Sequence, residues 1–120
     1  MRFLSIYRTK ERSTSPSIEV IAKMGKLMED GTKTGCLAAA EGCLPIALGA
    51  TVRSSKGDVA VVGGTVATNE VIGGFAIFRV EDKKEAIRLA KEFLEVAGDG
   101  ECELRQLYDA PPVPPASLKD

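Results

Sequence analysis

Three charged side chains, Glu41, Arg53 and Arg105, are the residues of this sequence best suited to act on a small molecule. Each lies in a different segment of strand-like sequence. If the three converge, Glu41 can act as a base or hydrogen-bond acceptor, and the two guanidinium groups can hold a small carboxylate through paired hydrogen bonds. The alternative is an ion pair that sets the strand register, which is the more common role for such residues. The pattern leaves both roles open.

Two further residues are candidates for lining the same site. Tyr7 lies in the first strand-like segment, where it either lines a cavity or packs in a core or interface with its hydroxyl satisfied. Glu70, with Asn69, precedes a glycine pair, and it either borders a pocket or lies in a surface loop. We therefore predict Arg53, Arg105, Tyr7 and Glu70 as ligand-binding residues and Glu41 as the weak catalytic candidate.

The groups that usually hold metals or transfer protons near neutral pH are scarce. The chain has no histidine, and its three cysteines, Cys36, Cys43 and Cys102, lack CxxC spacing. A zinc site is not predicted from this set, and no cofactor motif is present. Because histidine is the only side chain that titrates near neutral pH without a perturbed pKa, proton transfer here requires a carboxylate whose pKa is raised.

Length and charge limit the class of protein. A chain of 120 residues is typical of one domain, and the formal net charge of -1 supplies no field to attract nucleic acid or an anionic membrane. The apolar run over residues 3–7 is too short for a signal peptide, and no run is long enough to span a bilayer. We expect a cytoplasmic protein without nucleic-acid or membrane partners.

The hydrophobic pattern predicts two helices and six strands. Strands are expected at 2–8, 36–41, 50–54, 59–62, 71–80 and 101–108, and helices from Ser15-Pro16 to a stop between Gly31 and Gly35 and over 83–97. The apolar stripe of the first helix is predicted to be a packing face. Asp82 with Glu85 predicts a capped start for the second helix.

The strand over 71–80 organises the rest. Both of its alternating sets are apolar, with Phe75 and Ile77 on one side and Ala76, Phe78 and Val80 on the other, so both faces must be covered. Two helices can cover one face of a single sheet. This predicts an α+β, ferredoxin-like βαββαβ two-layer sandwich with an extra hairpin strand, whose open face is covered by a second subunit. Gly73 and Gly74 predict a bulge or the close approach of another backbone.

Four segments resemble the YCII-related family, specifically its DGPF-domain branch: 40–45 (AEGCLP), 50–53 (ATVR), 70–75 (EVIGGF) and 103–105 (ELR). The resemblance covers residues 1–109 and leaves 110–120 as a proline-rich tail. It implies a ferredoxin-like fold in which two sheets pair into a dimeric α+β barrel. It also implies a range of roles, since some YCII-like proteins are thought to use a His–Asp pair and a few relatives are small lyases or dehalogenating enzymes.

The sequence departs from the branch where chemistry is expected. Where the branch usually reads Asp-Gly-Pro-Phe-Ala-Glu, this chain reads GGTVA over 63–67, followed by Thr68, so both carboxylates are missing. We therefore expect a non-catalytic homodimer that binds a small apolar or carboxylated molecule in its barrel. The alternatives are a small lyase or isomerase that uses Glu41 as acid or base, and a scaffold that binds a partner through its proline-rich tail.

Overall fold

The computed structural model describes residues 1–11, 15–63 and 70–109. The tail predicted over 110–120 and the degenerate motif after Gly63 lie outside the described residues. The elements are, in order, β1 (Arg2–Lys10), α1 (Ile18–Thr34), β2 (Leu37–Gly42), a 3-10 turn η1 (Ile46–Leu48), β3 (Ala50–Ser55), β4 (Asp58–Gly63), β5 (Glu70–Arg79), α2 (Lys83–Ala97) and β6 (Glu101–Gln106).

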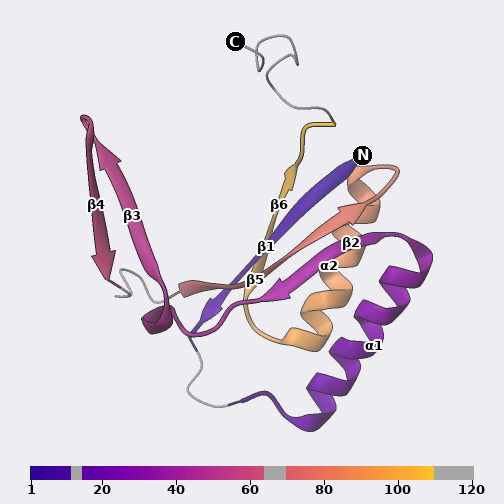
Figure 1. Cartoon of the computed structure of the whole chain (residues 1–120). Helices are drawn as coiled ribbons and strands as arrows, with labels where there is room; N and C mark the ends of the chain where they lie inside the picture. The colour runs from indigo at the N-terminus through magenta and orange to yellow at the C-terminus, as the bar shows by residue number, and fades with distance from the viewer. Residues whose placement is uncertain (12–14, 64–69, 110–120) are drawn as a thin grey trace.

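Four strands form one antiparallel sheet in the order β2-β5-β1-β6. Both helices lie on the same side of this sheet, as Figure 1 shows. This is the predicted α+β, ferredoxin-like arrangement, with β5 and β1 in the centre. The strands β3 and β4 pair only with each other and form a separate two-stranded ribbon, which is the predicted hairpin. Its tight turn has both central residues at positive φ, Lys56 at 50° and Gly57 at 87°.

Strand register confirms that both faces of the sheet are apolar. On β1, Phe3, Ser5 and Tyr7 alternate with Leu4 and Ile6, and the first three are buried while the other two are half-buried. On β5, Phe78 and Ala76 lie opposite Phe3 and Ser5, and Ile77 and Phe75 lie opposite Leu4 and Ile6. The first set faces the helices and the second set forms what we call the outer face of the sheet.

The core lies between the helix-facing side of the sheet and α2. Phe3, Phe78, Val80 and Ala86 form its buried cluster, and Ala86 on α2 is fully inaccessible. The capped start predicted for α2 is confirmed, because the Asp82 carboxylate accepts a hydrogen bond from the Glu85 backbone N–H at 2.9 Å. α2 is therefore held in place by its cap and by its row of small residues against the sheet.

At the glycine pair of β5 the structure shows both predicted features, a bulge and the close approach of another backbone. The register between β1 and β5 shifts between Tyr7 and Arg8, next to Gly73 and Gly74, so the strand is bulged there. A Cβ on Gly74 would lie 2.6 Å from the Glu41 carbonyl oxygen of β2. Only glycine therefore allows β2 and β5 to approach so closely at this point.

The predicted start of α1 is wrong by two residues. The cap is Ser17 rather than Ser15, because the Ser17 hydroxyl accepts a hydrogen bond from the Val20 N–H at 3.2 Å and Pro16 precedes the cap. The predicted stop is confirmed, since Gly35 ends the helix at a φ of 82°. β6 also ends two residues before the predicted boundary. No described helix is long and apolar enough to cross a bilayer.

Candidate functional site

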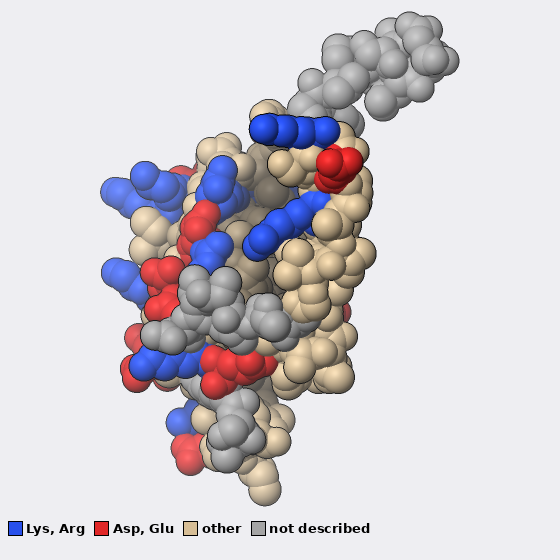
Figure 2. Space-filling view, turned by 90° about the vertical axis from the view of Figure 1, so that its left-hand side faces the viewer, with Lys and Arg blue, Asp and Glu red and all other residues tan. Residues whose placement is uncertain are grey.

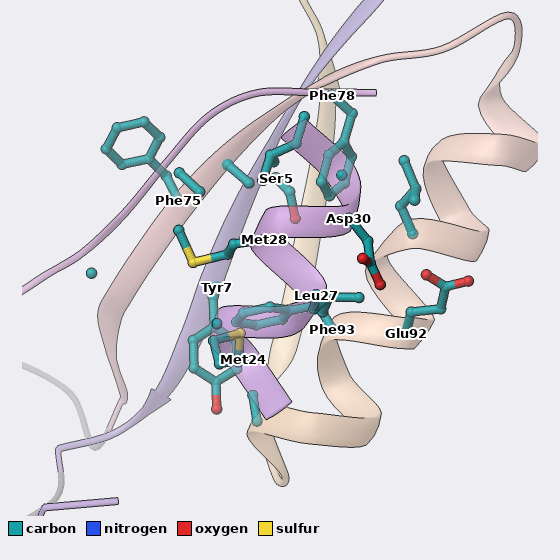
Figure 3. Close-up of a pocket in the computed structure, with 18 of the residues that line it drawn as sticks. Ser5, Tyr7, Met24, Leu27, Met28, Asp30, Phe75, Phe78, Glu92 and Phe93 are labelled. Atoms are coloured by element: carbon teal, nitrogen blue, oxygen red, sulfur yellow. The ribbon is translucent and has the colours of Figure 1, made fainter. Parts of the chain in front are cut away.

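An apolar cleft of about 780 Å³ lies between α1, α2 and the helix-facing side of the sheet. Figure 3 shows Met24, Leu27 and Met28 of α1 on one side of it and Tyr7 and Phe93 beside them. Ala40 and Ala76, paired across β2 and β5, belong to its floor. A cleft of this size lies within the range that holds small organic ligands.

The cleft exists because most of α1 does not pack closely against the sheet. None of its residues is buried, and Ile21 and Met28 are 57% and 38% exposed. At Gly31 the helix does touch the sheet, where an added Cβ would lie 2.9 Å from the Cβ of Leu37, whereas an added Cβ at Gly25 would meet nothing within 4 Å. The predicted packing face of α1 is thus only partly right, since much of it forms the wall of a cleft.

Tyr7 lines this cleft from β1. Its ring packs edge-on against Phe93 of α2, with centroids 5.0 Å apart and planes at 77°. Its hydroxyl donates a hydrogen bond to the Asp99 carbonyl oxygen at 2.9 Å. Tyr7 is therefore both a buried aromatic with a satisfied hydroxyl and a cavity-lining residue, and its contact with a ligand stays a prediction.

Three of the four charged residues of the cleft lining, Asp30, Arg88 and Glu92, are already in ion pairs, and Glu41 is the fourth. Arg88, the one lysine or arginine among the described lining residues, is 2.6 Å from the Glu92 carboxylate. Asp30 lies 3.3 Å from Lys26, one turn earlier in α1. A ligand carboxylate would have to displace Glu92 to reach a cation here, so the lining favours a neutral ligand.

The constellation of Glu41, Arg53 and Arg105 does not assemble within one chain. Glu41 is on β2 and Arg105 is on β6, the two opposite edges of the sheet, which three strand spacings separate by about 14 Å. Arg53 is on the separate ribbon. Glu41 borders the cleft, although its register opposite Phe75 places it with the outer face. Their roles in binding or catalysis stay predictions.

Arg105 takes part in an ion network on the outer face. Glu103 lies 2.8 Å from Arg8 and 3.3 Å from Arg105. The hydrogen bond from Arg105, followed by that from Arg8, holds the pKa of the Glu103 carboxyl below its usual range. An ion pair that sets the strand register is the alternative to ligand binding that the sequence leaves open for Arg105. The last predicted residue, Glu70, is exposed at the start of β5, opposite Lys10.

The cysteines do not form a metal site in the part of the chain that the structure describes, where no three potential ligands cluster. Cys36 lines the cleft and accepts a hydrogen bond from the Thr34 hydroxyl at 3.2 Å. Burial raises the pKa of the Cys102 thiol, against the smaller opposite effect of a hydrogen bond with Ser5. A thiol with a raised pKa is a poor nucleophile at neutral pH.

Sequence reasoning missed the α1 side chains as site residues. Val20, Met24 and Leu27 read as core positions, because an apolar stripe has the same spacing whether it faces a packed core or a cleft. Two methionines in one wall are the available signal, since flexible thioether side chains suit surfaces that adapt to a ligand.

Comparison with known proteins adds a family and a distant structure. The chain resembles a 5-chloro-2-hydroxyhydroquinone dehydrochlorinase from Burkholderia phenoliruptrix AC1100, solved in complex with 2,5-dihydroxybenzoquinone, at 15% identity and a TM-score of 0.48. That likeness covers 92% of this chain and 96% of the other, and it is too distant to transfer an activity. No curated protein matches the chain. The family model of the YCII-related domain matches residues 1–109, and the chain therefore belongs to the YCII-related family.

Proposed function

We propose that this YCII-related protein binds a small, neutral and mostly apolar molecule in the cleft under α1, and that it does so as a non-catalytic homodimer. The observation that carries the proposal is the cleft itself, with its volume of about 780 Å³ and its wall of aliphatic, thioether and aromatic side chains. Membership of the DGPF-domain branch and a cytoplasmic location are parts of the same proposal.

The chemistry of the lining defines the ligand class. Phe93, Tyr7 and Met24 offer apolar and aromatic contact, which suits a flat ring or a short hydrocarbon chain. Burying a ligand carboxylate without a paired cation would cost several kcal/mol in principle, and Arg88 is already bound to Glu92. The neutral form of such a ligand is therefore expected to bind better than its anion.

The placement of the acidic groups supports binding rather than turnover. Asp30 and Glu92 sit in ion pairs, so neither carboxylate is positioned to take a proton from a ligand in the cleft. The lyase alternative depends on Glu41, which borders the cleft although its register opposite Phe75 places it with the outer face.

The outer face supports a homodimer. It carries Leu4, Ile6 and Ile77 half-buried, with Ile72 and Phe75 at 49% and 38% exposed. This apolar patch lies between Glu41 at one edge of the sheet and the ion network of Arg105 at the other, and an apolar centre with a charged rim is typical of an interaction surface. A second copy seated on it by two-fold symmetry would present the same apolar residues in return.

The ligand class is tested with two probes of nearly the same shape. Titration calorimetry at pH 7 is expected to give a micromolar Kd for 2-naphthol, which is neutral, and a Kd at least about ten-fold weaker for 2-naphthoate, which is an anion. Equal or tighter binding of 2-naphthoate would contradict the neutral preference. If neither probe gives a heat of binding up to its solubility limit, the cleft is not a binding site for small aromatic molecules.

A further inference from the structure

No described element of the chain covers the ribbon of β3 and β4. Neither strand is hydrogen-bonded to the four-stranded sheet, and every residue of the two strands is exposed except Val62, which is half-buried. An isolated two-stranded hairpin is at best marginally stable in water, because it needs further strands or a helix against one face. The ribbon therefore needs a surface that the described residues of one chain do not supply.

One face of the ribbon is apolar. Val52 lies directly opposite Val61, and they are 64% and 71% exposed, while Val59, next along the same face, is 69% exposed. The opposite face carries Thr51 and Arg53 in β3 and Ala60 and the half-buried Val62 in β4. The alternation of polar and apolar residues along β3 is what a strand shows when one face is packed and the other is in solvent. We call Val52, Val59 and Val61 the valine face.

We propose that the valine face of the ribbon docks on a second copy of this chain, so that each subunit of a homodimer clasps the other with its ribbon. The inference rests on the homodimer of the proposed function and adds the element that secures it.

The position of the ribbon favours this occupant. Figure 1 shows the ribbon on the side of the sheet that faces away from α1 and α2, which is the side of the outer face. A second copy seated on the outer face would lie beside the ribbon. Figure 2, seen from the ribbon side, shows charged side chains gathered on one half of the surface and mostly uncharged residues on the other half.

The area that a dimer interface needs is an independent reason to include the ribbon in it. Four strands at about 4.8 Å spacing and about 20 Å length give the outer face a flat footprint of about 380 Å². A standard stable interface buries about 800 Å² of accessible surface on each partner. The ribbon adds a further footprint of about 200 Å² per subunit, or about half as much again. Side-chain relief enlarges these flat values, so the two surfaces together approach the area that a stable dimer needs.

The test compares two double variants with the same change in charge. Val52→Asp with Val61→Asp places two carboxylates on the valine face, whereas Thr51→Asp with Ala60→Asp places them on the opposite face of the same two strands. Sedimentation equilibrium on the full chain is expected to show a dimer Kd weakened at least about 100-fold for the first variant. For the second variant we expect a Kd within about three-fold of the unaltered chain.

The outcomes separate the two proposals. If the unaltered chain is monomeric at all concentrations, the homodimer fails and the clasp fails with it. If the unaltered chain is a dimer and the valine-face variant dimerises equally well, the clasp is overturned while the homodimer stands.

Hydrogen exchange on the unaltered chain gives the same decision without mutation. The amides of β3 and β4 are expected to exchange more slowly as protein concentration rises through the dimer Kd, and concentration-independent exchange in a dimerising protein would overturn the clasp.

Discussion

Replacing Phe78 with alanine is expected to destabilise the folded chain by about 3–5 kcal/mol. Phe78 is 6% exposed, and it packs with Phe3, Val80 and Ala86 in the small buried cluster between β5 and α2. The truncation removes apolar burial and leaves a cavity that an already small core has few side chains to fill. Because domains of this kind are stable by about 5–15 kcal/mol in total, the variant should lie close to unfolding at physiological temperature.

The matched control is Phe75→Ala, the same truncation on the same strand and on the opposite face. Phe75 is 38% exposed, so its loss should cost no more than about 2 kcal/mol in urea denaturation of the monomer. The two free energies of unfolding are compared at one protein concentration below the dimer Kd. Equal losses for both variants would mean that the core does not lie on the helix-facing side of β5.

Replacing Ala40 with phenylalanine is expected to abolish binding in the cleft, with at least about a 30-fold loss of affinity for 2-naphthol. Ala40 is half-buried on the cleft floor, opposite Ala76 of β5, and a ring at this position would project into the space between the sheet and α1. Aromatic residues are well tolerated in strands, and the ring enters an existing hollow, so the chain should still fold. Fluorescence or calorimetric titration measures the change in Kd.

The control for this variant is Ala39→Phe, one residue earlier on the same strand. Ala39 lies opposite Ile77, which places it on the outer face. Binding of 2-naphthol by this variant should stay within about three-fold of the unaltered chain. Loss of binding by Ala39→Phe with retention by Ala40→Phe would place the ligand on the outer face and not in the cleft.

Most of the fold follows from local patterns. The two-fold alternation of Phe3, Ser5 and Tyr7 and the capped start of α2 at Asp82 depend on neighbouring residues, so the sequence alone predicts them. The Gly74 close approach was predictable in kind, since glycine within a strand marks such points. The start of α1 was missed because Ser15 and Ser17 both flank Pro16, and spacing does not tell which hydroxyl reaches an unpaired helix N–H.

The site depends on distances between elements, which the sequence does not contain. An apolar stripe on α1 predicts a buried face, yet the helix touches the sheet at Gly31 and leaves the residues before it as a wall. The sequence places Glu41 near the end of one strand and Arg105 within another, and it does not say how far apart these strands lie in the sheet. The strand order then places them on opposite edges of the sheet, since two central strands separate them.

The most direct test of the binding cleft is a methyl-labelled NMR spectrum recorded with and without saturating 2-naphthol. We predict that the largest shift changes fall on the methyl groups of Val20, Met24 and Leu27, which line the cleft from α1. Shift changes confined to Leu4, Ile6 and Ile77 would instead place the ligand on the outer face of the sheet and contradict the account.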